Sequence, residues 1–268
     1  VDSIMTDSAN SMSAYQTGHK SSVNATGVYA NTSRVFDTDT EEGAPVPDQA
    51  YDDPWVETFS EIIQSRMGKS VGAISTRYVV DATPAALWGH GRERYDETRS
   101  QYALQAIYQG RNAERGWTPF NIDVLLGGGA SYWLPENIDG SRRSDEIDVL
   151  TAYEELGFAI AGTGSELEEV MSGETPERLL GLFTPRDYPY WLDRNIYTEN
   201  ISDFPDQPGL VDMTMAALEV LNQNENGFYL MVEAGAIDRA LHPLDFDRAI
   251  ADTIEFDMAV AATMDYLE

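Results

Sequence analysis

The chain lacks cysteine entirely and contains only two lysines among its 268 residues. Without thiols it can form neither a disulfide framework nor a thiolate zinc site, and a cysteine nucleophile is excluded. No apolar run reaches the length of a membrane span. The opening residues carry no signal-peptide pattern and read like the interior of a protein, which leaves room for a leader ahead of them.

Positive charge is scarce throughout the sequence. Asp and Glu number 46 against 17 Lys and Arg, so the formal net charge is −29. Such a field repels the phosphates of nucleic acids and anionic membrane surfaces, and we expect neither as a partner. An anionic substrate would be repelled as well, unless bound cations or clustered arginines reverse the sign of the charge locally.

The acidic excess with few lysines predicts a protein that works in high salt, where self-repulsion is screened. We therefore expect its resistance to unfolding to rise with NaCl concentration, as measured by denaturant or thermal unfolding. Undiminished stability in dilute buffer would contradict this hypothesis.

The hydrophobic pattern predicts an α/β fold, with a mostly parallel sheet and helices on both faces. Apolar runs that end in polar or Gly-rich residues are expected as buried strands at 70–76, 121–129 and 227–235. Helical spacing is found at 53–68, 83–110 (as two helices), 144–157, 209–224 and 245–268. Long loops are expected at 37–54 and 183–209.

We expect one domain over residues 1–268, cut at both ends. The last predicted helix reaches Glu268 without a stop signal. One face of that helix is apolar and requires a sheet to pack on; its residues are Phe246, Ile250, Ile254, Met258, Ala261 and Met264.

Three stretches contain residue types suited to catalysis. The first is "MTDSANSMSAYQTGHK" (5–20), in which Asp7-Ser8 precedes a run of small residues. Asp or Ser could simply cap a helix that Gly18 ends, and this is the commoner arrangement. Alternatively, a serine in the first helical turn faces unpaired N–H groups that favour an alkoxide or a phosphate.

The second stretch is "VEAGAIDRALH" (232–242). Glu233 follows an apolar strand, at the sheet edge where α/β proteins bind ligands. Asp238 and His242 are four residues apart and would share one helix face, a spacing that suits two ligands of one zinc. A plain helix N-terminus with a solvated histidine is equally compatible with this pattern.

The third stretch is "VVDATPAALWGHGRERY" (79–95). Thr83 as N-cap with Pro84 at the first helical position would make a helix start. Asp81 and Thr83 also offer the hard oxygens that magnesium prefers, and Arg94 could hold a phosphate through two parallel hydrogen bonds. A solvated Arg94, with Arg92 nearby, is the default alternative.

The remaining sequence patterns give less information about function. "GGG" (127–129) is expected as a tight strand-to-loop turn, because no Gly-Lys-Ser/Thr follows it. A Gly-x-Ser-x-Gly elbow is absent. His19 and His90 lie in predicted helices and are interpreted as structural.

Taken together, these segments resemble the alkaline phosphatases over essentially the whole chain. The similarity lies in "TDSANSMSAYQTGHK", "GAISTRYVVDATPAALWGH", "NIDVLLGGG", "ERLLGLFTPRDYPYWLDR" and "LMVEAGAIDRALH", which occur in the family's order.

The resemblance implies a phosphomonoester hydrolase with Ser8 as the nucleophile that becomes phosphoserine. Arg94 would hold the phosphate oxygens, oriented by Asp7. The family's two Zn²⁺ and one Mg²⁺ imply the following ligands here: Asp238 and His242 for the first zinc, Ser8 for the second, and Glu233, Thr83 and Asp81 for magnesium. Arg239 would either touch phosphate through water or be a surface arginine.

The sequence also departs from the family pattern. The family has an Asp ahead of the nucleophile, and an Asp-His pair and a further His after the segment that ends here. With three histidines in total, this chain cannot supply them, so we expect weak zinc binding and poor catalysis from residues 1–268 alone.

The resemblance further implies a homodimer, located in the periplasm or outside the cell and acting on small phosphomonoesters. Two alternatives stay open: a phosphodiesterase or sulfatase-like relative, and a non-catalytic acidic metal-binding or scaffold fragment.

Overall fold

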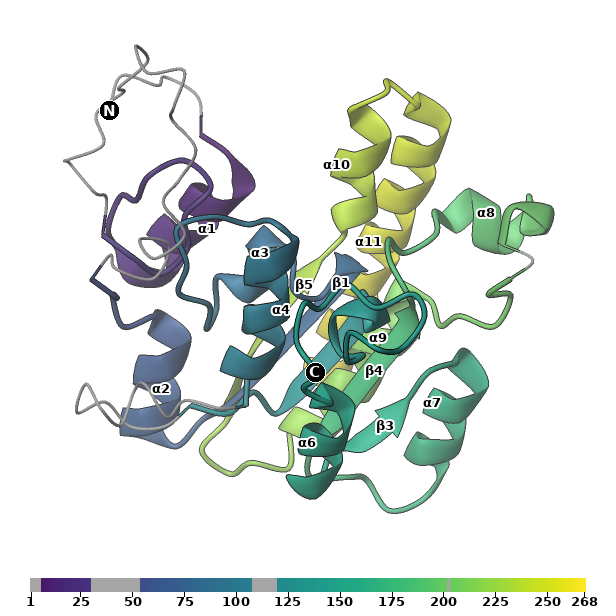
Figure 1. The fold of residues 1–268 in the computed structure, drawn as a ribbon. Coiled ribbons are helices and arrows are strands. Elements are labelled where there is room, and N and C mark those ends of the chain that lie inside the picture. The colour runs from purple at the N-terminus through teal and green to yellow at the C-terminus, as the bar shows by residue number, and fades with distance from the viewer. Residues whose placement is uncertain (1–5, 30–53, 108–119, 202) are drawn as a thin grey trace, which may run out of the picture. The chain divides into compact units, whose positions relative to one another are not determined.

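The computed structural model describes residues 6–29, 54–107, 120–201 and 203–268 (Figure 1). They fall into two compact units. The first unit comprises the described residues of 1–68 and 80–121, and the second comprises those of 69–79 and 122–268. Most of the predicted acidic loop at 37–54 lies outside the described residues.

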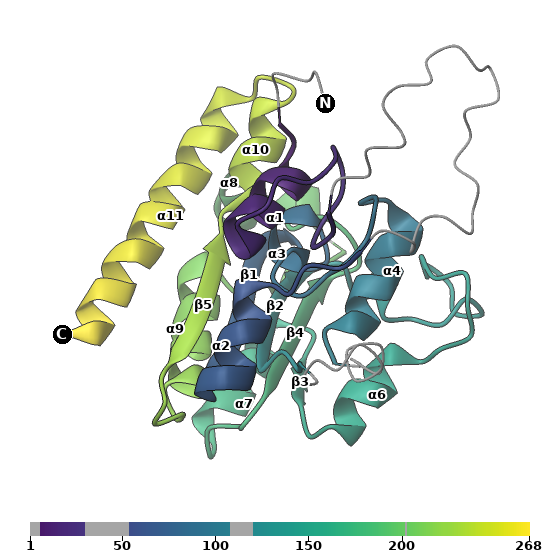
Figure 2. The same ribbon diagram turned by 90° about the vertical axis from the view of Figure 1, so that its left-hand side faces the viewer.

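The second unit contains a five-stranded sheet in the order β3-β4-β2-β1-β5. Every neighbouring pair is parallel, which confirms the predicted α/β class with a mostly parallel sheet (Figures 1 and 2). The three predicted strands are present, and β3 and β4 were not predicted. The strands are β1 (Ser70–Tyr78), β2 (Val124–Gly128), β3 (Ala159–Ala161), β4 (Leu179–Thr184) and β5 (Phe228–Glu233).

In the second unit, all three helices that the hydrophobic spacing predicts are present. The expected helices at 144–157, 209–224 and 245–268 are α6 (Val149–Glu155), α9 (Leu210–Leu221) and α11 (Phe246–Leu267). The predicted loop at 183–209 instead contains the end of β4, α8 (Trp191–Asn195) and the short turn η4 (Thr198–Ile201). The remaining elements are η3 (Ala130–Tyr132), α7 (Gly164–Ser172) and α10 (Gly235–Leu241).

The core of the second unit forms between the sheet and α9. Ile74 of β1 and Leu126 of β2 join Met213 and Leu221 of α9 in one buried cluster. Each such side chain contributes about 1.5–3 kcal/mol by leaving water. The glycine run ends β2 as predicted, because Gly129 has a φ of 98°, which suits a turn without a side chain.

Helix α11 runs alongside α9 (Figure 2) and buries Asp252 and Ala259 toward the protein. Its predicted apolar stripe faces the other way in the part of the chain that the structure describes, with Phe246 and Ile250 about 60% exposed. The rest of the stripe is similarly exposed at Ile254, Met258 and Met264. In the described ranges, no helix combines the length and apolar character needed to cross a bilayer.

The buried carboxyl of Asp252 on α11 predicts a pH-dependent stability. Burial is the main cause that raises the pKa of Asp252 to about 7, although the Trp191 N–H donates to this carboxylate at 3.3 Å. The folded pKa therefore lies above the unfolded one, near 3.8. The folded state binds the extra proton, so the stability that it contributes is present below pH 4 and is lost as pH rises toward 7.

We expect Asp252→Asn to remove this loss, which amounts to about 1.4 kcal/mol per pH unit at its steepest. Denaturant unfolding between pH 4 and 8 measures the effect. The exposed Asp257→Asn on the same helix is the matched control. An unchanged pH profile in Asp252→Asn would contradict the assignment.

The first unit contains α1 (Ser8–Thr17), α2 (Phe59–Met67), α3 (Ala82–Ala85) and α4 (Asp96–Gln105). The predicted helix at 53–68 is the shorter α2, and the pattern at 83–110 does form two helices within its described part. One prediction is wrong: Asp81, rather than Thr83, is the N-cap residue of α3, so Thr83 is already helical.

The histidines of this unit are placed outside helices, contrary to the prediction. His90 is buried between α3 and α4, with its Nδ1 2.7 Å from the Gly27 carbonyl and its Nε2 3.0 Å from Glu61 Oε1. Its ring stacks on Trp55 with centroids 4.2 Å apart. These contacts support the structural role expected for His90. His19 follows the C-cap residue Gly18 and is exposed.

Candidate active site

Ser8 is the first residue of α1, and Asp7 provides its cap. The Asp7 carboxylate accepts hydrogen bonds from the N–H groups of Ala9 and Asn10, at 3.3 and 3.2 Å. The Asn10 side chain accepts in return from the Asp7 N–H at 3.1 Å, which completes a capping box. Because Asp7 does the capping, the Ser8 hydroxyl is free of that task and Ser8 is exposed.

Arg94 brings three predicted residues of the first unit together. Its Nη1 donates to Ser8 Oγ at 2.5 Å and lies 3.6 Å from Asp7 Oδ2. Its Nη2 donates to Asp81 Oδ1 at 3.0 Å, so Asp81 holds the guanidinium more closely than Asp7 does. The arrangement places a fixed positive charge against an exposed serine oxygen, which stabilises negative charge there.

Arg99 is a member of this cluster that the sequence analysis missed. Its Nη2 donates to the same Asp81 Oδ1 at 2.7 Å. Two guanidinium groups therefore share one buried carboxylate, and Asp81 is engaged with arginines in this structure. Thr83 lies nearby in sequence, on α3, and is half-buried. No local pattern distinguishes Arg99 from an ordinary arginine on a helix surface.

Glu233, in the second unit, ends β5 directly opposite Ser75 of β1. The Ser75 hydroxyl donates to Glu233 Oε2 at 2.5 Å and accepts from the Arg77 N–H at 3.0 Å. Parallel register thus fixes the carboxylate at the carboxyl end of the sheet, the edge where the sequence predicted ligand binding.

Asp238 and His242 share one face of α10, as their spacing predicts. Asp238 Oδ2 lies 3.4 Å from His242 Nε2, and the two side chains are 68% and 75% exposed. Arg77 Nη1 lies 3.5 Å from the same Asp238 oxygen. The pair is accessible to an ion from solvent.

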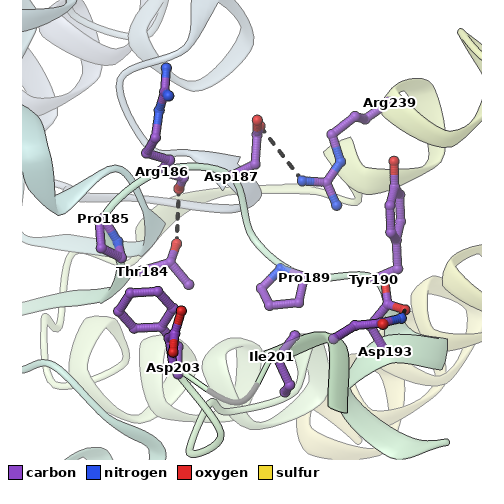
Figure 3. Close-up of a pocket in the computed structure, with 12 residues that line it drawn as sticks. Thr184, Pro185, Arg186, Asp187, Pro189, Tyr190, Asp193, Ile201, Asp203 and Arg239 are labelled. Atoms are coloured by element: carbon purple, nitrogen blue, oxygen red, sulfur yellow. Dashed lines mark hydrogen bonds and ion pairs between the residues drawn. The ribbon is translucent and has the colours of Figure 1, made fainter. Parts of the chain in front are cut away.

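Arg77, Asp187 and Arg239 form an ionic chain in the second unit. Asp187 Oδ1 lies 3.4 Å from Arg77 Nε and 3.8 Å from Arg239 Nη1. Arg239 also stacks over the Tyr190 ring, with its Cζ 3.9 Å from the centroid, and its side chain is only 20% exposed. Arg239 is therefore a half-buried, ion-paired residue (Figure 3), and its contact with phosphate stays a prediction. Treating 179–184 as a strand would have directed attention to Asp187, just beyond its carboxyl end.

The donor types fit metal ions in part. A carboxylate with an imidazole, as in Asp238 and His242, suits zinc, and the oxygens of Glu233, Asp81 and Thr83 suit magnesium. Over the residues that the structure describes, no three or more His, Cys, Asp or Glu side chains converge on one point. The donors present thus supply incomplete ligand sets.

The chain matches the sequence model of the Alkaline phosphatase family over residues 1–268. It is 30% identical over 275 residues to the tissue-nonspecific alkaline phosphatase of Homo sapiens, covering 95% of this chain and 48% of that protein. Alkaline phosphatase 4 of Bacillus subtilis (strain 168) is 30% identical over 264 residues, covering 98% and 46%. The chain spans about half the length of these relatives.

Solved structures agree with the sequence relatives. The alkaline phosphatase of Thermus thermophilus superposes with a TM-score of 0.73 at 25% identity, covering 97% of this chain and 45% of that one. A TAB5 alkaline phosphatase variant with Mg bound in its M3 site gives a TM-score of 0.68 at 21% identity, covering 97% and 60%. The fold and these matches define the class, and the chain belongs to the alkaline phosphatase family.

Proposed function

We propose that the protein hydrolyses phosphate monoesters by passing the phosphoryl group through Ser8. The observation that carries this proposal is the exposed Ser8 Oγ at the start of α1, 2.5 Å from Arg94 Nη1. A helix N-terminus and a guanidinium both stabilise a phosphate dianion. They also offset locally the repulsion that a chain of net charge −29 exerts on such a substrate.

In this proposal Ser8 Oγ loses its proton and bonds to phosphorus, the P–O bond to the alcohol breaks, and the alcohol leaves with a proton, while Arg94 binds the non-bridging oxygens. Asp81 and Asp7 keep the guanidinium in place through contacts of 3.0 and 3.6 Å. Water then bonds to the phosphorus of the phosphoserine and the bond from phosphorus to Ser8 Oγ breaks, which releases inorganic phosphate and restores the serine hydroxyl. Positioning and charge stabilisation are what phosphoryl transfer requires of a protein.

Arg94→Ala should weaken competitive inhibition by inorganic phosphate about 10- to 100-fold, because a charged hydrogen bond contributes about 1.5–3 kcal/mol. Some turnover should survive. The neighbouring Arg92→Ala is the matched control. Unaltered inhibition in Arg94→Ala, or an equal loss in Arg92→Ala, would contradict the role given to Arg94.

We further propose that the whole protein carries two Zn²⁺ and one Mg²⁺. Asp238 and His242 would hold the first zinc, Ser8 the second, and Glu233, Thr83 and Asp81 the magnesium. Bound divalent ions would supply charge stabilisation for the attacking and leaving oxygens. The TAB5 alkaline phosphatase variant, which shares the fold and has Mg bound in its M3 site, supports the proposal that the reaction depends on metal ions. Ser75 would orient Glu233, and Arg77 would neutralise Asp238 when the site is empty.

Small phosphomonoesters are the proposed substrates, and a homodimer exported to the periplasm or beyond the cell is the proposed form. The test compares turnover of three substrates: p-nitrophenyl phosphate, bis-p-nitrophenyl phosphate and p-nitrophenyl sulfate. Dominant turnover of the monoester is expected. Dominant diesterase or sulfatase turnover would reject the proposal, and no turnover of any of them would favour a scaffold.

A further inference from the structure

A groove of about 300 Å³ lies between α7 and α9, entirely within the second unit. Leu167 and Met171 line it from α7, and Met215 and Ala216 line it from α9. Both helices lie beside the sheet (Figure 2), and Leu167 and Ala216 belong to the same buried core cluster. The two walls of the groove are therefore held together by the core. A volume at the lower end of the range for ligand sites, about 300–1,000 Å³, admits a few side chains of a peptide.

Four carboxylates line the same groove and give it a negative charge. They are Glu168 of α7, Asp206 ahead of α9, and Asp212 and Glu219 of α9, and all four residues are exposed. No Lys, Arg or His occurs among the described residues that line the groove. The apolar side chains lie deeper than the carboxylates, because they are buried or half-buried. A cationic partner with an apolar part would complement this arrangement.

Two of the four carboxylates have a structural role, and two do not. Asp206 accepts hydrogen bonds from the Ser165 N–H at 3.2 and 3.3 Å, and Asp212 accepts one from the Gly209 N–H at 2.8 Å. The carboxylates of Glu168 and Glu219 make no hydrogen bond or ion pair with any other described residue. Their charges are therefore available to a partner.

The carboxylates of α9 have a spacing that a short peptide can match. Asp212 and Glu219 are seven residues apart on the helix, so their Cα atoms are separated by about 10 Å along its axis. Met215 lies between them in the sequence and lines the groove. In an extended peptide, residues three positions apart are also separated by about 10 Å. Two cationic residues at that spacing, with an apolar residue between them, would match both the charges and Met215.

Gln207 favours a peptide over a simple amine as the ligand. It lines the groove, and its Nε2 and Oε1 atoms are both buried without a hydrogen-bond partner among the described residues. Such an unsatisfied amide is costly. A peptide group has both an acceptor and a donor and would satisfy both atoms once the side chain turns toward it, whereas a protonated amine has only donors.

We propose that the groove between α7 and α9 binds a short extended segment of a partner protein, in which two cationic residues three positions apart flank an apolar one. The cationic side chains pair with Asp212 and Glu219, beside Glu168. The apolar side chain enters the groove, and the peptide backbone pairs with Gln207. This interaction uses none of the residues of the proposed phosphoryl transfer, so it goes beyond the proposed function.

Fluorescence anisotropy of labelled peptides tests the proposal with the full chain. The salt concentration is the lowest at which circular dichroism shows a folded chain, because screening is then weakest. The probe is a blocked hexapeptide with Arg at its second and fifth positions, Leu and Ala between them, and Gly at both ends. The control peptide has the same composition with its two Arg adjacent. A chain of charge −29 attracts both peptides, but we expect the probe to bind at least about fivefold more tightly.

Glu168→Lys should weaken binding of the probe by at least about tenfold, because it places like charges together. Glu169→Lys is the matched control: Glu169 is the exposed neighbour on α7, does not line the groove, and changes the net charge by the same amount. Gln207→Leu should weaken binding by at least about threefold without lowering the thermal unfolding temperature, since it removes an unsatisfied buried amide.

Equal binding of the two peptides, or an equal loss in Glu168→Lys and Glu169→Lys, would overturn the inference, because either result would indicate non-specific attraction to an acidic chain. Displacement of the probe by 1,8-diaminooctane as readily as by unlabelled probe would also overturn it, in favour of a polyamine ligand. Failure of the proposed function would look different: p-nitrophenyl phosphate would not be hydrolysed, and binding of the peptides would be unaffected.

Discussion

Ser8→Ala is expected to abolish the phosphorylated intermediate and to lower kcat/KM for p-nitrophenyl phosphate by about 10³-fold or more. The variant removes the only oxygen of that side chain, and Arg94 Nη1 loses the acceptor that it reaches at 2.5 Å. Helix α1 should persist, because Asp7 and Asn10 make the capping box without Ser8. Acid-quench labelling with ³²P-phosphate, followed by peptide mass analysis, measures the intermediate.

The control for this variant is Ser11→Ala in the same helix. The Ser11 hydroxyl donates to the Asp7 carbonyl at 2.6 Å and has no part in the proposed chemistry. It should keep labelling and most turnover. A labelled intermediate that survives in Ser8→Ala would refute the nucleophile assignment, and loss of labelling in both variants would point to damage of the helix start.

Removing metal ions is the second large effect that we expect. Chelation with EDTA should lower phosphatase activity by about 10³-fold or more, since the proposed metal ions would supply charge stabilisation for the attacking and leaving oxygens. Added Zn²⁺ with Mg²⁺ should restore the activity. Elemental analysis before and after chelation gives the metal content. Full activity in the metal-free protein would end the metal proposal.

Asp238→Ala tests whether Asp238 is one of the zinc ligands on which this metal-dependent activity relies. Loss of one ligand should weaken zinc binding by at least about 10- to 100-fold, the loss that second-shell changes alone produce. Asp247→Ala, an exposed change in the first turn of α11, is the control. Equal zinc affinity in the two variants, measured by competition with a chromogenic chelator, would contradict the ligand role of Asp238.

The fold was predictable where the hydrophobic pattern was long. The run that became β2 and the spacing of α9 are both continuous enough to indicate their elements. β3 has only three residues, Ala159–Ala161, and its short apolar segment is stabilised as a strand by pairing with β4. A pattern of that length does not distinguish strand from loop.

The site was predictable where its residues are close in sequence. The spacing of Asp238 and His242 is a helix property, and Asp7 caps the residue beside it. The ion pair of Asp81 with Arg99 joins the start of α3 to α4, and that of Arg77 with Asp187 joins residues far apart in sequence. Only the folded chain brings such partners together, and so the sequence did not show that Asp81 anchors Arg94.

The apolar face of α11 has a consequence for handling the protein. Mutual repulsion of chains with a charge of −29 keeps exposed Phe246 and Ile250 of neighbouring molecules apart in dilute buffer. A high salt concentration shortens the range of that electrostatic repulsion and strengthens the association of apolar surfaces. Salt should therefore stabilise each molecule against unfolding and at the same time favour aggregation through α11. Light scattering should be recorded with every thermal unfolding curve to separate the two effects.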